Sequence, residues 1–241
     1  MPFGTGRMIF EGFAGSPFRN LFKLGMGTEL FYSFVIITCS LMVYYGTKEL
    51  YELSSYKGIK YFRQAFLFFA LAYFFRSIIK FLLLYFGLNG VIDFSPITFG
   101  AFGLLTQLLF VYFSSMAIFY LLYSVMWKKW NQSSYNIYLF NIAAFVIAFV
   151  SILSKNHFVH FGLNVFLLLI VIFVVYTSYK NKKKGHNLYL IYLLWSIFWI
   201  LNIIDILIPN LFQGLQLFIY IASTLTFLLI LYKVIKNVGA N

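Results

Sequence analysis

Acidic residues are scarce in this sequence, which has six Asp and Glu against 18 Lys and Arg among its 241 residues. Of the six acids, only Asp205 lies well within a long apolar segment, and Glu29 lies at the edge of another. General acid–base catalysis and the Asp-rich magnesium sites of prenyl or phosphoalcohol transfer need acids held in pairs or clusters. The apolar segments contain no such pair, and we therefore expect no enzyme of these kinds.

Cysteine and histidine are also rare, which limits metal and cofactor chemistry. The single cysteine, Cys39, excludes an intramolecular disulfide and a thiolate metal cluster. His157 and His160 are spaced so that a helix would place both on one face, where they could hold a metal with a third ligand such as Asp93. Two histidines without an evident third ligand are more often ordinary polar groups at an interface. We expect neither a metal nor a cofactor.

Several motifs of familiar membrane proteins are missing as well. The chain has no Gly-x-Ser-x-Gly nucleophile turn, no Gly-rich phosphate loop and no lysine in the middle of the last apolar segment that could carry retinal. It lacks the spaced His and Asp of seven-span zinc amidases and the proline and glutamine pair of the three-plus-one-plus-three sugar carriers. The sequence therefore predicts a protein that is not an enzyme.

Charge of either sign is infrequent: 10% of the residues are charged, 62% are hydrophobic and the mean hydropathy is +0.88, whereas a soluble domain averages about 25% charged residues. A bilayer core needs about 20 apolar residues per helix. The apolar segments are continuous rather than alternating, which favours helices over a β-barrel. The sequence predicts an all-α, multi-pass cell-membrane bundle of seven transmembrane helices, at residues 30–46, 61–86, 98–127, 136–154, 158–179, 187–208 and 212–235.

The basic residues predict the orientation of this bundle, because they are retained on the cytoplasmic side. With the N-terminus outside, twelve cations fall in inner segments, against four in outer segments. The inner set is Lys48, Lys57, Lys60, Arg63, Lys128, Lys129, Lys180, Lys182, Lys183, Lys184, Lys233 and Lys236, and the outer set is Arg7, Arg19, Lys23 and Lys155. We expect an outer segment at 1–28 that is interfacial or partly disordered, a seven-helix domain at 29–236 and a cytoplasmic tail at 237–241.

The net charge of +12 follows from this orientation and does not require a nucleic-acid partner. Cations in short loops beside a span meet anionic lipid headgroups, at about 1 kcal/mol each. The bilayer is therefore the expected partner, and nucleic acid is not. The densest basic cluster could also dock a cytoplasmic or membrane protein, and consists of Lys180, Lys182, Lys183 and Lys184.

Arg76 and Lys80 lie four residues apart inside the second predicted span. A cation at the bilayer centre costs about 2.5 to 3.5 kcal/mol, so polar partners are expected nearby. Asn202 and Asp205 would share one face of the sixth span at a comparable depth in the outer half. The whole predicted polar cluster is Arg76, Lys80, Asn202, Asp205, Glu29 and Asn164.

Two interpretations of this cluster remain open. In one, Arg76 pairs with Asp205 to hold two helices together while Lys80 reaches the headgroups. In the other, the same residues form a pocket for a solute or ligand. The sequence favours a non-enzymatic, receptor-like sensor or accessory membrane protein that acts through a separate partner. The alternative is a small-solute transporter, which would need a carboxylate free to titrate.

Overall fold

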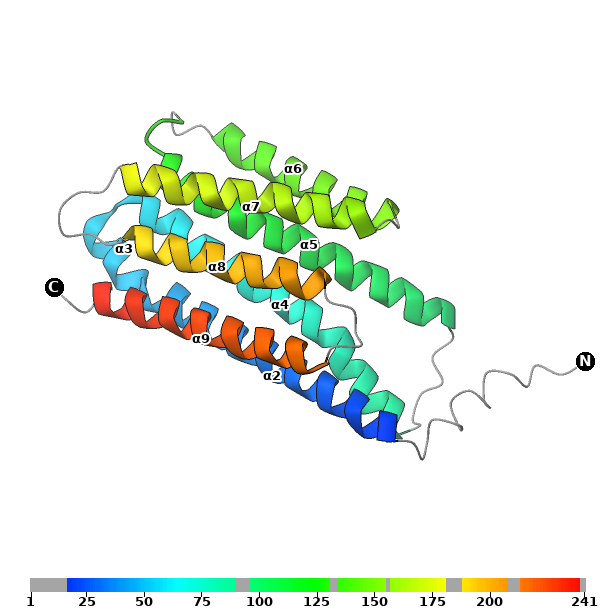
Figure 1. Ribbon diagram of the computed structural model, residues 1–241. Coiled ribbons are helices and arrows are strands. Elements are labelled where there is room, and N and C mark those ends of the chain that lie inside the picture. Colours follow the sequence, from blue (N-terminus) through cyan, green and yellow to red (C-terminus); the bar gives the residue numbers. More distant parts are fainter. Residues whose placement is uncertain are drawn as a thin grey trace, which may run out of the picture.

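The computed structural model describes residues 17–89, 96–130, 134–154, 157–180, 188–207 and 213–238. All regular secondary structure in this part of the chain is α-helical, which confirms the all-α part of the predicted fold class. A short helix, α3 (Lys48–Ser54), joins the first two of seven long helices (Figure 1). The long helices are α2 (Pro17–Gly46), α4 (Lys57–Asn89), α5 (Pro96–Met126), α6 (Ser134–Leu153), α7 (His157–Lys180), α8 (Leu188–Leu207) and α9 (Gln213–Val238).

Each predicted span falls on one long helix, and most of the predicted ends lie within three residues of the ends of that helix. The largest difference is at α2, which begins at Pro17, inside the segment predicted as an interfacial or partly disordered extension. Apolar composition marks where a helix meets lipid, and the helix itself can continue into more polar sequence. Residues 1–16 and 239–241 lie outside the described part of the chain.

Length and composition make five apolar stretches candidates for crossing a membrane. Among the described residues these are Gly27–Ser54, Ala101–Met126, Tyr135–Leu153, Phe158–Lys180 and Gly214–Lys236. Helix α8 adds a shorter apolar stretch, Tyr189–Asp205. Helix α4 carries Arg63 and Arg76 within its apolar sequence. These helices support a multi-pass membrane protein.

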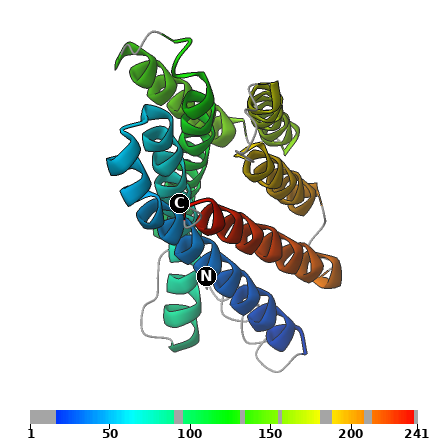
Figure 2. The same ribbon diagram turned by 90° about the vertical axis from the view of Figure 1, so that its left-hand side faces the viewer.

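Six of the long helices form a closed ring. Going round it, α2 contacts α4, α4 contacts α5, α5 contacts α7, α7 contacts α8, α8 contacts α9, and α9 returns to α2. Helix α6 packs outside this ring against α5 and α7 (Figure 1 and Figure 2). The start of α2 and the end of α9 lie at opposite ends of the bundle (Figure 1). Because α9 closes the ring against α2, these two helices are neighbours although they are the furthest apart in sequence of the long helices.

Aromatic side chains fill the middle of the ring. We call this group the aromatic plug, and it consists of Phe66 and Phe69 from α4, Trp195 and Phe198 from α8, and Phe227 from α9. The ring centroids of Phe66 and Trp195 are 4.8 Å apart, and those of Phe69 and Phe227 are 5.5 Å apart. All five side chains are at most 1% exposed. Because lipid is itself apolar, such close packing is what holds helices together inside a membrane.

Candidate functional site

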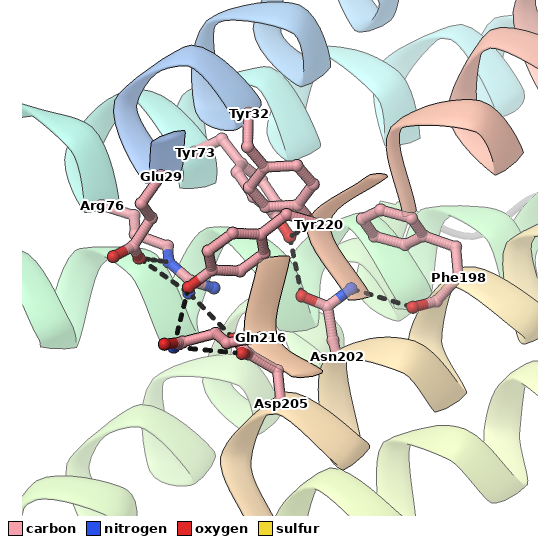
Figure 3. Close-up of polar contacts among 9 residues, drawn as sticks. All are labelled: Glu29, Tyr32, Tyr73, Arg76, Phe198, Asn202, Asp205, Gln216 and Tyr220. Atoms are coloured by element: carbon pink, nitrogen blue, oxygen red, sulfur yellow. Dashed lines mark hydrogen bonds and ion pairs between the residues drawn. The ribbon is translucent and has the colours of Figure 1, made fainter. Parts of the chain in front are cut away.

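An ion-pair cluster lies between α2, α4 and α8, about two helical turns from the aromatic plug along α4 and α8. Arg76 donates from Nε and Nη2 to Oε1 of Glu29, at 3.2 and 3.0 Å. Its Nη2 also lies 3.5 Å from Oδ2 of Asp205. The side chains of Arg76, Glu29 and Asp205 are 20%, 12% and 11% exposed. One cation is thus shared by two largely buried acids (Figure 3).

A chain of hydroxyl and amide groups lies beside this cluster. Tyr73 donates its hydroxyl proton to Oδ1 of Asn202 at 2.8 Å, so Tyr32, 3.0 Å away, is the donor to the Tyr73 hydroxyl oxygen. The amide nitrogen of Asn202 donates to the carbonyl of Phe198 at 2.9 Å. Every polar atom in this chain therefore has a partner, as buried polar groups require.

Helix α9 completes the arrangement through Gln216. Its Nε2 donates to Oδ1 of Asp205 at 3.4 Å and to the hydroxyl of Tyr220 at 3.0 Å. The ring of Tyr220 stacks on that of Tyr32, with centroids 5.0 Å apart. We call the whole set the polar belt, which consists of Glu29, Tyr32, Tyr73, Arg76, Asn202, Asp205, Gln216 and Tyr220 (Figure 3). It joins α2, α4, α8 and α9 at one level of the bundle.

A partly enclosed cavity of about 340 Å³ opens next to the polar belt. Its wall on α4 and α8 includes Tyr73, Arg76, Asn202 and Asp205. Phe69, a member of the aromatic plug, also lines it. The remaining lining comes from α5, α6 and α7, with polar groups at Thr106, Gln107, Ser114, Ser151, His160 and Asn164. The cavity is therefore lined by charge on one side and by neutral hydrogen-bonding groups on the other.

The neutral side is organised around His160. Its Nδ1 lies 2.7 Å from Oγ of Ser151, and its Nε2 lies 3.4 Å from Nδ2 of Asn164. Asn164 also donates to the carbonyl of His160 at 2.8 Å, and accepts from Nε1 of Trp199 at its own carbonyl at 3.3 Å. Among the described residues, no group of three or more His, Cys, Asp and Glu is placed to hold a metal ion. Asp93, the third ligand considered from the sequence, lies outside them.

The structure brings together most of the predicted cluster, but the main partner of Arg76 differs from the predicted one. Arg76 does contact Asp205, but Glu29 is its closer partner and accepts two of its hydrogen bonds. Asn202 joins through Tyr73, and Asn164 lies on the far wall of the same cavity. The backbone of Lys80 belongs to α4, and its side chain lies outside the described part of the structure.

Sequence reasoning missed the tyrosines, Gln216 and the place of His160 in the cavity wall. A signal for the first two was available, because each helix of the polar belt carries two polar residues at helical spacing. The pairs are Glu29 with Tyr32, Tyr73 with Arg76, Asn202 with Asp205, and Gln216 with Tyr220. Such i,i+3 and i,i+4 pairs share a helix face, so polar pairs on several spans at similar depth predict a polar layer.

Most of the predicted basic cluster lies outside the described residues. Lys180 is the last residue of α7, and Lys182, Lys183 and Lys184 lie outside the described residues. Their suggested role in docking a partner remains a prediction.

A known protein resembles part of this chain. It is similar to an uncharacterized protein of Archaeoglobus fulgidus, with 32% identity over 139 residues. This match covers 54% of the chain and 56% of the relative, so the chain spans about half the length of the curated relative that it matches. No protein-family model matches the sequence, and no solved structure matches it.

Proposed function

We propose that this protein binds a small polar solute in the cavity beside the polar belt and acts as a non-enzymatic, receptor-like membrane sensor or accessory protein. In this proposal all seven long helices cross the membrane, the N-terminus is outside, and the cavity lies in the outer half. The observation that carries the proposal is a cavity lined by both Arg76 and Asp205 inside a largely apolar bundle.

Two physical arguments support a binding role over a purely structural one. Charged side chains inside a membrane bundle are costly and usually mark a site of function. A simple ion pair between helices would be packed tightly, whereas Arg76 and Asp205 border a cavity of about 340 Å³. Small-molecule sites generally have volumes of about 300 to 1,000 Å³, which suits a small ligand here.

A transporter is the second candidate, and one feature favours it. The cavity lies beside Phe69, and the rest of the aromatic plug fills the bundle beyond this residue. A binding site next to a closed, packed core resembles one state of an alternating-access cycle. The sensor needs no passage through the plug, whereas the transporter needs the plug to open.

Ligand binding and uptake separate these functions. The purified protein is expected to gain thermal stability with at least one small charged or zwitterionic solute, since a ligand that binds only the folded state stabilises it. Binding without uptake into proteoliposomes supports the sensor, and binding with uptake supports the transporter. If no solute in a broad panel raises the melting temperature, the proposal fails.

The proposed orientation gives a separate prediction. In a variant with Cys39 replaced by serine, a cysteine placed at Lys182 is expected to react with an impermeant thiol reagent only from the cytoplasmic side. A cysteine at Ser95 is expected to react only from outside. The reverse labelling pattern would contradict the orientation and would place the cavity in the inner half.

A further inference from the structure

We propose that the ligand of this cavity is a small organic cation, specifically a protonated amine that is bound by Asp205. This inference rests on the proposed function, since it names the class of ligand for the same cavity. It depends on how the positive charge of Arg76 is shared between the two acids.

Arg76 directs most of its hydrogen bonding to Glu29. Glu29 accepts from both Nε and Nη2, at 3.2 and 3.0 Å, whereas Asp205 receives a single contact from Nη2 at 3.5 Å. Charge-assisted hydrogen bonds of this type are typically about 2.7 to 2.9 Å long. The contact with Asp205 is therefore weak, although its side chain is only 11% exposed.

The other donor to Asp205 is also distant. Nε2 of Gln216 lies 3.4 Å from its Oδ1, while the same nitrogen lies 3.0 Å from the hydroxyl of Tyr220. Both carboxylate oxygens of Asp205 thus receive long contacts. Asp205 lines the cavity, and Glu29 is not among the residues that line it. The carboxylate with the weaker protein contacts is therefore the one that a ligand can reach.

The aromatic lining favours a cation as well. Phe69, Phe110 and Trp199 line the same cavity as Asp205, and aromatic faces attract ammonium groups. Phe110 already interacts in this way with the guanidinium of Arg76, whose Cζ lies 5.4 Å from its ring centroid. A primary ammonium group would add short N–H donors to Asp205, whose present contacts with Arg76 and Gln216 are 3.5 and 3.4 Å long.

An anionic ligand fits this wall less well. It would have to compete with Glu29 for Arg76 and would stand beside the carboxylate of Asp205, where like charges repel. Arg76 also lines the cavity, but it is shared by Glu29 and Asp205, so the three groups together carry one net negative charge and favour positive charge on the ligand.

The test compares isobutylamine with isobutanol, isovalerate and valine, which have similar branched carbon skeletons and carry positive, zero, negative and zwitterionic charge. Binding to the full-length protein in nanodiscs is measured by calorimetry at neutral pH, together with linear amines of two to six carbons. We expect an amine to bind at least about tenfold more tightly than the matched alcohol, as a charged hydrogen bond allows. We expect isovalerate not to bind.

The key variant is Asp205→Asn, which keeps the shape and removes the charge. We expect it to weaken amine binding about tenfold or more and to leave isobutanol unchanged. Glu49→Gln makes the same change in net charge on the short helix α3 and is expected to leave amine binding within about twofold.

A second variant covers the case in which Asp205→Asn does not fold. Gln107 lies on the cavity wall and is exposed, so Gln107→Lys would introduce a competing ammonium group without disturbing the core. It is expected to abolish amine binding, whereas Gln107→Met is expected to retain it.

The outcomes distinguish this inference from the function on which it rests. Valine or isovalerate binding without amine binding would overturn the cation assignment and leave solute binding intact. Amine binding that is unchanged in Asp205→Asn, or in a folded Gln107→Lys, would also overturn it. If the wild-type protein binds none of these compounds, the cation inference fails, and the broad solute panel then decides the proposed function separately.

Discussion

Replacing Arg76 with alanine is expected to lower the free energy of unfolding by about 3 to 5 kcal/mol, the range for removing one partner of a buried ion pair. The carboxylates of Glu29 and Asp205, which are 12% and 11% exposed, would then lose the cation that they share. Thermal or denaturant unfolding of the purified protein in mild detergent measures the change. Lys60→Ala, at an exposed position of the same helix, is the control and is expected to stay within about 0.5 kcal/mol.

Double-mutant cycles should show which acid, Glu29 or Asp205, is coupled more strongly to Arg76. Because Glu29 accepts two of the Arg76 hydrogen bonds and Asp205 accepts one longer contact, the coupling energy between Arg76 and Glu29 is expected to exceed that between Arg76 and Asp205. Removing both partners of the stronger pair should recover part of the loss seen for Arg76→Ala. Strictly additive losses in both cycles would show that the three charges do not stabilise one another.

The second large effect is expected in the aromatic plug, where Trp195→Ala should cost about 3 to 5 kcal/mol of stability. The Trp195 side chain is fully buried, and its ring centroid lies 4.8 Å from that of Phe66 and 4.9 Å from that of Phe69. Alanine would leave a cavity at a point where three helices meet. Unfolding in detergent, compared with the wild type, gives the loss.

Phe218→Ala provides the matched control, because this aromatic residue of α9 is 65% exposed and is expected to change stability by less than about 1 kcal/mol. Trp195→Phe should lie between the two, since it keeps one aromatic ring in the plug. Equal effects of Trp195→Ala and Phe218→Ala would mean that the plug does not hold the bundle together.

Sequence reasoning found the residues that had an energetic reason to meet. Arg76 inside an apolar helix needs an anion, and Asp205 is the acid most deeply placed within another apolar segment, so their contact could be predicted from cost alone. The preference of Arg76 for Glu29 over Asp205 could not be predicted in this way. It depends on how α2 packs against α4, which brings Glu29, at the edge of a predicted span, to the same level as Arg76.

The order of the helices round the ring also could not be predicted from the sequence. All seven segments are apolar on most faces, and lipid-facing and helix-facing positions look alike when both are Phe, Leu or Ile. Nothing in the composition of α6 marks it as the helix outside the ring, and nothing in α2 and α9 marks them as neighbours. The tyrosines were overlooked for the same reason, because a membrane protein has many at its interfaces.

The neighbourhood of α2 and α4 has a consequence for how the chain enters the membrane. Synthesis proceeds from the N-terminus, so Glu29 has already been made when Arg76 leaves the ribosome, whereas Asp205 follows 129 residues later. The first helical hairpin thus carries its own counter-ion during insertion and does not have to wait for the sixth long helix to offset the cost of a buried cation. The contacts between α2 and α9 can form only after the last long helix has been made, so Gln216 and Tyr220 are the last members to join the polar belt.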